Sequence, residues 1–341
     1  MDNAIYAKLD ELTQRILNGG EMSSEEGCWM IALDDDYLPW MMAGADRIRK
    51  TFRGNQVEVC AISNVRSGNC SENCSFCAQS GHYKTAAPVY NYISSEQLKQ
   101  QAETARAWGA SDFGVVSKGW GVRNDKERAQ LKEYFATMSS HSDIGRCASL
   151  GVLDAQSADE LKGMGLENYH HNLECAESFF DQVCTTHTYQ ENIDTIINAR
   201  NAGLRVCAGG ILGMGESLDQ RIELAETLRR IGVESVPLNF LNPQAGTPMG
   251  EQSPMTAHEI LKSIVVFRYM LPKSEIRIAG GRQFLGDMQA MIFMAGASGV
   301  MIGDYLTTKG RKVEDDLDML KNLKLMPRED TQQRRLQAKA Q

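Results

Sequence analysis

Short apolar runs alternate with amphipathic segments along most of the chain, and this alternation predicts the fold. Eight runs are typical of buried strands: residues 57–62, 112–116, 144–150, 167–173, 204–208, 233–239, 275–279 and 298–302. Helical patterns separate them, and several begin with a capping-box pair: Ser94 with Gln97, Thr188 with Glu191, Ser217 with Gln220 and Thr256 with Glu259. Strand–helix alternation indicates a parallel sheet. Eight such units over about 265 residues predict an α/β fold, a closed (β/α)8 TIM barrel.

The same pattern divides the chain into three parts. The first part carries apolar residues at steps of four and three, typical of a helix: Ile5, Leu9, Leu12 and Ile16. Residues 1–54 are therefore predicted to be an N-terminal helical extension, 55–325 the barrel, and 326–341 a disordered tail. An open doubly wound sheet is the competing architecture. It would need a glycine-rich phosphate turn after its first strand, where this chain carries three cysteines.

Composition and charge narrow the class of protein. Hydrophobic residues make up 42% of the 341 positions and charged residues 23%, as in folded globular proteins. The formal charge of −8 argues against a nucleic-acid-binding surface. No apolar stretch reaches the roughly 20 residues that span a bilayer, and the N-terminus lacks the features of a secretory signal. Nine cysteines suit metal binding in a reducing compartment, so we expect a cytoplasmic protein with no nucleic-acid or membrane partner.

A group of three cysteines follows the first predicted strand. Cys70, Cys74 and Cys77 have the spacing Cys-x3-Cys-x2-Cys. Three thiolates can hold three irons of a [4Fe-4S] cluster, whereas the ferredoxin pattern supplies four cysteines per cluster. One iron then keeps an open coordination position for chemistry, as a catalytic zinc does. The alternative is a zinc knuckle with a distant fourth ligand, although zinc cysteines usually come as Cys-x2-Cys pairs.

Four residues with ligand or charge capacity fall on the odd-numbered strands of the predicted barrel: Cys60, Cys147, Cys207 and Arg277. Alternate strands contribute the side chains of one interior layer, so these four are predicted to face one another inside the barrel. An arginine there is costly unless an anion pairs with it, and a sulfide-rich cluster with its thiolates would be such an anion. The alternative is that small buried cysteines simply pack well.

The remaining cysteines carry less weight. Cys28 lies in the helical extension and is expected to be buried filler. Cys175 and Cys184 follow the fourth strand, and either one could approach a cofactor bound there.

Polar residues also gather at predicted strand ends. Asn172 and Glu174 close the fourth strand two positions apart, and Asn239 closes the sixth. Two convergent amides suit a planar urea-like or ribose-like ligand, because an amide offers both donors and an acceptor. The alternative for each asparagine is a cap at the end of a strand. The glycine-rich segment 209–216 follows the fifth strand and would let backbone approach an adenine or ribose closely.

These motifs together resemble a known family. Cys70-x3-Cys74-x-Phe76-Cys77 resembles the signature of radical S-adenosylmethionine (SAM) enzymes, and the longer segment 67–80 resembles the biotin synthase family. The likeness covers roughly residues 55–325 and includes these further segments: 169–174, 188–191, 209–216, 234–239, 246–248 and 277–282. Matches over most of the strand–helix units are far more specific than the three-cysteine loop, which marks only the superfamily.

The resemblance implies a radical SAM sulfurtransferase that inserts sulfur into dethiobiotin to give biotin. Its expected cofactors are SAM, a [4Fe-4S] cluster on the three clustered cysteines, and an auxiliary iron–sulfur cluster deeper in the barrel. Reductive cleavage of SAM would give a 5′-deoxyadenosyl radical that abstracts hydrogen from an unactivated carbon, and the auxiliary cluster would donate sulfide. Such carbon–hydrogen bonds offer no handle to an acid or base, so a cofactor must bring the reactive species.

The resemblance also implies roles for individual residues. Those expected to contact SAM are Asn172, Glu174, His187, Gly210 and Gly213. Asn172 and Asn239 are expected to hold the ureido ring of dethiobiotin. His187 stands where the family often has an arginine for the SAM carboxylate. Since a histidine is shorter and only partly charged at neutral pH, SAM is expected to be held differently here.

The auxiliary cluster is where the chain departs from its relatives. Well-known members hold a [2Fe-2S] cluster with cysteines on strands two, three and five and an arginine on strand seven. Here the strand-two position is Gly114, which cannot ligate, while Cys60 adds a thiol on strand one. The expected ligands are Cys60, Cys147, Cys207 and Arg277. A four-iron cluster with an extra sulfide is the preferred expectation, and a [2Fe-2S] cluster is the alternative.

Two rival functions remain open at this point. One is a hydrogenase-maturase-like radical SAM enzyme without sulfur insertion, and the other is a non-catalytic iron–sulfur or zinc protein. The main hypothesis implies dethiobiotin as substrate, an electron donor such as flavodoxin or ferredoxin, and an iron–sulfur assembly or sulfide source. A homodimer is also expected.

Overall fold

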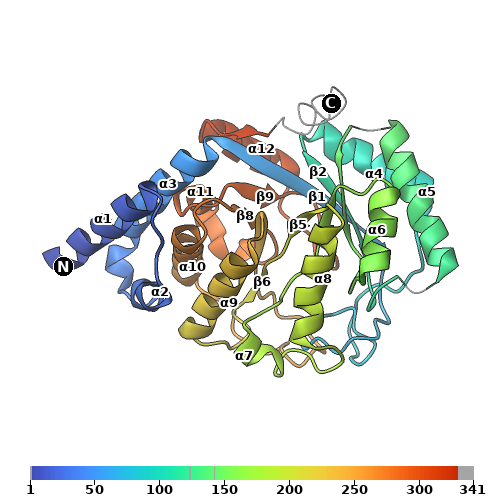
Figure 1. The fold of residues 1–341 in the computed structure, drawn as a ribbon, viewed down its shortest axis with the longest axis horizontal. Coiled ribbons are helices and arrows are strands. Elements are labelled where there is room, and N and C mark those ends of the chain that lie inside the picture. The colour runs from blue at the N-terminus through green and yellow to red at the C-terminus, as the bar shows by residue number, and fades with distance from the viewer. Residues whose placement is uncertain (1, 123, 142, 329–341) are drawn as a thin grey trace.

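The computed structural model describes residues 2–122, 124–141 and 143–328, and its core is a closed parallel barrel surrounded by helices (Figure 1). Eight strands form the barrel: β1 (Gln56–Arg66), β2 (Asp112–Ser117), β3 (Gly145–Ser149), β4 (Asn168–His170), β5 (Arg205–Cys207), β7 (Ser235–Phe240), β8 (Glu275–Ile278) and β9 (Gly299–Met301). Each strand pairs in parallel with the next, and β9 pairs with β1 to close the sheet. The predicted TIM barrel is confirmed, with a strand at each of the eight predicted places.

Helices cover the outside of the barrel. They are α4 (Ser95–Ala107), α5 (Asp125–His141), α6 (Ala155–Gly163), α7 (Glu177–Phe180), α8 (Tyr189–Asn201), α9 (Leu218–Ile231), α10 (Ala257–Met270), η2 (Arg282–Met288), α11 (Met291–Met294) and α12 (Val313–Asn322). The predicted capping boxes begin four of them, at Ser94, Thr188, Ser217 and Thr256. In the described ranges, no helix is both long and apolar enough to cross a membrane.

Two short strands were not predicted. β6 (Gly210–Leu212) pairs with β7 inside the glycine-rich segment. β10 (Met326–Pro327) pairs with the start of β1, so the ordered body extends past residue 325. The predicted boundary of the tail at 326 was therefore wrong, because local composition could not reveal a pairing with a strand about 270 residues earlier. The rest of the predicted tail, 329–341, lies outside the described residues.

The N-terminal extension consists of α1 (Asn3–Leu17), α2 (Ser24–Ile31), η1 (Asp35–Tyr37) and α3 (Leu38–Arg53), which lie at one side of the barrel (Figure 1). The predicted apolar stripe of α1 is buried at Leu9, Leu12 and Ile16. α3 packs between α1 and the barrel helix α10. The extension therefore shares one hydrophobic core with the barrel.

Gly44 allows α3 to approach α10 closely. A Cβ at this position would lie 1.8 Å from Tyr269 Oη and 2.7 Å from Thr13 Oγ1. Those two hydroxyls are hydrogen-bonded to each other at 2.7 Å, and Thr13 also donates to Leu9 O. One missing side chain thus lets α1, α3 and α10 meet at a buried polar contact.

We predict that Gly44→Ala lowers the free energy of unfolding by about 1–3 kcal/mol, because overpacking outweighs the gain of about 1 kcal/mol in helix propensity. Gly163→Ala is the matched control, since a Cβ at this helical glycine would meet nothing within 4 Å and should stabilise slightly. Urea unfolding of both variants measures the difference. If Gly44→Ala is as stable as Gly163→Ala, the close contact does not constrain α3.

Candidate functional site

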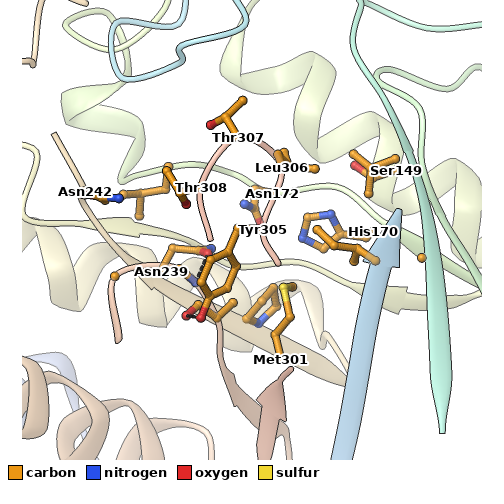
Figure 2. Close-up of a pocket in the computed structure, with 18 of the residues that line it drawn as sticks. Ser149, His170, Asn172, Asn239, Asn242, Met301, Tyr305, Leu306, Thr307 and Thr308 are labelled. Carbon is orange, nitrogen blue, oxygen red and sulfur yellow. Dashed lines mark hydrogen bonds between the residues drawn. The ribbon is translucent and has the colours of Figure 1, made fainter. Parts of the chain in front are cut away.

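A cavity of about 320 Å³ lies at the carboxyl ends of the barrel strands, and all eight strands contribute to its wall (Figure 2). Eight residues singled out from the sequence line it: Cys60, Cys77, Cys147, Asn172, Glu174, Cys207, Asn239 and Arg277. The cavity therefore connects the two cysteine groups, because Cys77 belongs to the three-cysteine loop and the other cysteines belong to the barrel strands.

Three buried thiols form the deep end of the cavity. Cys60 on β1, Cys147 on β3 and Cys207 on β5 all face inward, as their strand register predicted. On β2, Gly114 lies in register with Cys147, and an added Cβ would come within 3.0 Å of the Ile62 side chain. β2 therefore contributes no metal ligand at this position, and the missing side chain of Gly114 leaves space beside the thiols.

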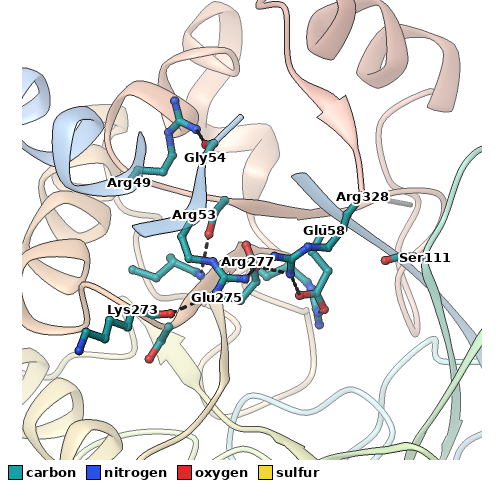
Figure 3. Close-up of polar contacts among 12 residues, drawn as sticks. Arg49, Arg53, Gly54, Glu58, Ser111, Lys273, Glu275, Arg277 and Arg328 are labelled. Carbon is teal, nitrogen blue, oxygen red and sulfur yellow. Dashed lines mark hydrogen bonds and ion pairs between the residues drawn. The ribbon is translucent and has the colours of Figure 1, made fainter. Parts of the chain in front are cut away.

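Arg277 shares the deep end with these thiols. Its Nη1 lies 3.5 Å from Cys207 Sγ, while its Nη2 pairs with Glu58 on β1 (Figure 3). A buried arginine was expected to need an anion, and the carboxylate of Glu58 already provides one. Glu58 precedes Cys60 by two positions and so lies on the same face of β1, a signal that the sequence analysis did not use.

Several arginines hold the buried Glu58. Burial alone would raise the pKa of Glu58, but Arg277 and Arg205 outweigh burial and keep that pKa well below its usual value. Arg205 Nη2 lies 2.9 Å from Glu58 Oε2, and Arg328 Nη1 lies 4.0 Å from the same oxygen. Arg328 also contacts Glu275 at 3.2 Å. This charged layer closes the barrel beneath the thiols.

The deep thiols are protonated in the metal-free chain, because burial raises their pKa values. The pKa of Cys60 rises to about 12, and those of Cys147 and Cys207 are also raised. A metal would displace these protons and leave thiolates beside the guanidinium of Arg277. Among the described residues, the buried Nε of Arg277 has no hydrogen-bond partner. The donor set and this orphaned N–H fit an anionic iron–sulfur group in the cavity.

Backbone hydrogen bonds within residues 70–81 help to order the three-cysteine loop. Cys70 N donates to Gln79 O at 2.8 Å, Gly81 N donates to Cys70 O at 2.8 Å, and Cys77 N donates to Cys74 O at 3.0 Å. All three cysteines are half-buried and form no disulfide. Burial raises the pKa of Cys77 to about 11, and the nearby Cys70 adds to the rise. Three half-buried thiols on one ordered loop fit a metal cluster.

Cys184 and His187 lie against this loop, in the segment between α7 and α8. Cys184 Sγ is 3.8 Å from Cys74 Sγ and 3.3 Å from His187 Nδ1, and that nitrogen is 2.9 Å from Glu72 Oε2. Burial alone would lower the pKa of His187, but Cys184 and Glu72 raise it to about 9. This raised pKa favours the charged form of the ring over the expected partial charge.

Asn172 and Glu174 meet on one side of the cavity, as predicted. Asn172 Nδ2 donates to Glu174 Oε2 at 3.2 Å, and its Oδ1 accepts from Gly209 N at 3.2 Å. Burial raises the pKa of Glu174 to about 7. Glu174 also has a φ of 68°, a conformation that costs a non-glycine residue about 1–3 kcal/mol and is concentrated at functional sites.

Asn239 fits both alternatives drawn from the sequence. It lines the cavity, and its Oδ1 accepts from Gly280 N at 2.9 Å while its Nδ2 donates to Gly210 O at 3.3 Å. The local structure itself favours glycine at positions 210 and 213. A Cβ at Gly210 would lie 2.6 Å from Glu174 O, and Gly213 has a φ of +87°. Their contact with SAM stays a prediction.

The sequence analysis missed other parts of the wall. His170 on β4 points into the cavity beside Asn172 (Figure 2), and burial lowers its pKa to about 4, so its ring is neutral. The segment 305–308 after β9 also lines the cavity, and Tyr305 Oη donates to Ala279 O at 2.9 Å. Spacing could have identified His170, two positions before Asn172. The loop after β9 carried no local signal, since only barrel closure brings it here.

Comparisons with known proteins agree with this site. Residues 64–228 match the Radical SAM superfamily, and residues 237–326 match the Biotin and Thiamin Synthesis associated domain. The biotin synthase of Syntrophotalea carbinolica is 45% identical over 311 residues, which cover 91% of this chain and 95% of that protein. The biotin synthase of Geotalea daltonii is 46% identical over 318 residues, which cover 93% and 97%.

Solved structures share the fold. Methylornithine synthase (PylB) matches with a TM-score of 0.83 at 17% identity, over 94% of this chain and 98% of that one. The FeFe-hydrogenase maturase HydG from Carboxydothermus hydrogenoformans matches with a TM-score of 0.77 at 18% identity, over 94% and 79%. At these identities the likeness extends to the fold alone. The sequence identity to full-length relatives is what decides the family, and the chain belongs to the biotin synthase family.

Proposed function

We propose that this chain inserts sulfur into dethiobiotin to form biotin, with SAM and two iron–sulfur clusters. The observation that carries the proposal is one cavity with Cys77 of the three-cysteine loop in its wall and Cys60, Cys147 and Cys207 at its deep end. A substrate between two such groups would meet a radical source on one side and a sulfur source on the other. Neither rival function needs this arrangement.

The family implies a [4Fe-4S] cluster and SAM, together with an auxiliary iron–sulfur cluster. We assign the first cluster to Cys70, Cys74 and Cys77, and the auxiliary cluster to the deep thiols. For the latter we prefer four irons with an extra sulfide over a [2Fe-2S] cluster, because the ligand set has moved from strand two to strand one. When bound, the cofactors supply one-electron hydrogen abstraction and a sulfide for the substrate.

Arg277 is assigned to the auxiliary cluster as a charged neighbour. Its Nη1 already faces Cys207 at 3.5 Å, and its Nη2 is bound to Glu58. A guanidinium stays positively charged, so it stabilises nearby thiolates and sulfide by its charge and by hydrogen bonds.

The cavity wall would bind and orient the two small molecules. We assign the amides of Asn172 and Asn239 to the ureido ring of dethiobiotin, and Asn172 with Glu174 to the SAM ribose. His187 would pair with the SAM carboxylate, which its raised pKa favours because the ring is charged. Gly210 and Gly213 are assigned to the same SAM site through their backbone.

The proposal extends to partners and organisation. An electron donor such as flavodoxin or ferredoxin and an iron–sulfur assembly or sulfide source are required by the chemistry. Nine free cysteines favour a cytoplasmic location, where thiols stay reduced. We also propose a homodimer, and a division into a helical extension at 1–54 followed by the barrel.

We predict that the anaerobically reconstituted chain, given SAM, dethiobiotin and a strong reductant, forms both biotin and 5′-deoxyadenosine. Cys70→Ala should form neither, because the open iron is lost with the cluster. Product analysis by mass spectrometry, beside iron, sulfide and zinc analysis, makes the measurement. 5′-Deoxyadenosine without biotin would favour the maturase-like rival, and zinc without acid-labile sulfide would favour the non-catalytic one.

We further predict that Cys60→Ala reduces biotin formation to background and removes the iron and sulfide of the auxiliary cluster, while 5′-deoxyadenosine formation persists. The reason is that Cys60 replaces the missing ligand at Gly114. Cys28→Ala is the matched control. Cys28 lies in α2, so its replacement should change neither the iron and sulfide content nor the biotin-forming activity. Mössbauer spectra of both variants provide the readout. A Cys60→Ala chain with both clusters and full activity would contradict the ligand assignment.

A further inference from the structure

An asparagine on β1 connects two walls of the cavity. Asn64 Nδ2 donates to the backbone oxygen of Leu306 at 3.0 Å and to Gln79 Oε1 at 3.3 Å. Gln79 belongs to the three-cysteine loop and Leu306 to the loop after β9 (Figure 2), and both residues line the cavity. One amide group therefore joins the wall of the three-cysteine loop to the wall formed by the loop after β9. The proposed function gives Asn64 no task.

Two backbone groups fix the orientation of both side-chain amides. Leu306 O can only accept, so the nitrogen of Asn64 must face it. Gly68 N can only donate and lies 3.4 Å from Gln79 Oε1, so the oxygen of Gln79 faces Gly68 and Asn64. The NH2 group of Asn64 carries two hydrogens, one for each acceptor. Both hydrogen bonds can therefore exist at the same time.

The backbone of β1 directs Asn64 toward these partners. Cys60 and Ile62 line the cavity, and Asn64 continues the same face of the strand. The register with β2 shifts between Asn64 and Arg66, and such irregularities re-aim side chains beside active sites. Tyr90 Oη donates to Asn64 O at 2.7 Å. The strand and this contact hold the amide between the two walls.

Gln79 is firmly attached to the three-cysteine loop. Its backbone oxygen accepts from Cys70 N at 2.8 Å, and the residue is only 5% exposed. A displacement of the Asn64 amide relative to this loop would therefore break the hydrogen bond to Gln79.

The loop after β9 is shaped by bonds of its own between residues 304 and 310. Tyr305 N donates to Thr308 O at 2.9 Å, and Gly310 N donates to Asp304 Oδ1 at 3.1 Å. These bonds shape the segment 304–310 but do not attach it to β1. The hydrogen bond from Asn64 to Leu306 O makes that attachment.

We propose that Asn64 is a positioning residue that fixes the segment 304–310 relative to the three-cysteine loop. The inference rests on the proposed function in taking this loop as the SAM side of the cavity and the segment 304–310 as a wall against the substrate. Transfer of a hydrogen atom needs the reacting atoms close and aligned, and a displacement of about 1 Å can cost about 100-fold in rate. Two hydrogen bonds from one strand keep the two walls at one separation.

Amide hydrogen exchange of the full chain, purified anaerobically and followed by mass spectrometry, tests the attachment without any turnover. Asn64→Leu has a similar volume and no donor, so peptides that cover 304–310 should exchange about fivefold faster, as the loss of one hydrogen bond predicts. Asn198→Leu is the matched control. Asn198 is also half-buried, and its Nδ2 donates to the backbone oxygen of Leu153 at 2.9 Å, away from the cavity wall. This control should leave exchange at 304–310 unchanged.

Product analysis of the reconstituted variants, given SAM, dethiobiotin and a reductant, tests the consequence for the reaction. Asn64→Leu should form 5′-deoxyadenosine at the unmodified rate while the ratio of 5′-deoxyadenosine to biotin rises about tenfold, because fewer cleavage events find the substrate carbon in place. Asn198→Leu should keep the ratio. Asn64→Ser, which is too short to reach both acceptors, repeats both measurements if the leucine variant does not fold.

The outcomes separate this inference from the proposed function. Unchanged exchange at 304–310, or an unchanged product ratio in a folded Asn64 variant, overturns the role of Asn64. A fall of both products together also overturns it, because Asn64 would then support only the fold or the cluster. If the unmodified chain forms neither product, the proposed function fails, and hydrogen exchange still decides whether Asn64 holds the segment.

Discussion

The buried ion pair between Glu58 and Arg277 is the interaction on which the interior of this barrel depends. Two charges inside a closed sheet cost free energy unless each has a partner and further hydrogen bonds. Here Arg205 and Arg328 complete the shell around Glu58, and Arg277 keeps one nitrogen on Cys207. The pair therefore anchors a positive charge beside three thiols, where a metal-bound sulfur group would carry negative charge.

The two cysteine groups differ in how they are held. The deep thiols are side chains of rigid strands, with positions set by the register of the barrel. The three-cysteine loop is irregular, and it is held by its own backbone hydrogen bonds and by the segment between α7 and α8. The register of the sheet thus fixes the deep thiols, whereas the position of the three-cysteine loop depends on its contacts with a second segment.

Surroundings shift the charge of several groups away from what the residue type alone suggests. Glu72 and Cys184 face one nitrogen of His187 and raise its pKa to about 9, whereas burial that no carboxylate offsets lowers the pKa of His170 to about 4. Glu174 is near its midpoint of protonation at neutral pH, since burial raises its pKa to about 7. The wall of the cavity thus presents one neutral ring, that of His170, and one carboxyl group of variable charge, that of Glu174.

Periodicity and spacing alone determined the barrel, its eight strands, the helix starts and the inward direction of Cys60, Cys147, Cys207 and Arg277, because these depend on local repeats of two and 3.6 residues. Only the tertiary structure decided what each inward group meets. The pairing of β10 with β1, the ion pair of Arg277 with Glu58 and the contact of Cys184 with Cys74 join residues 110 or more positions apart. Such contacts leave no periodic trace in the sequence, since they arise only when the barrel closes and its loops meet.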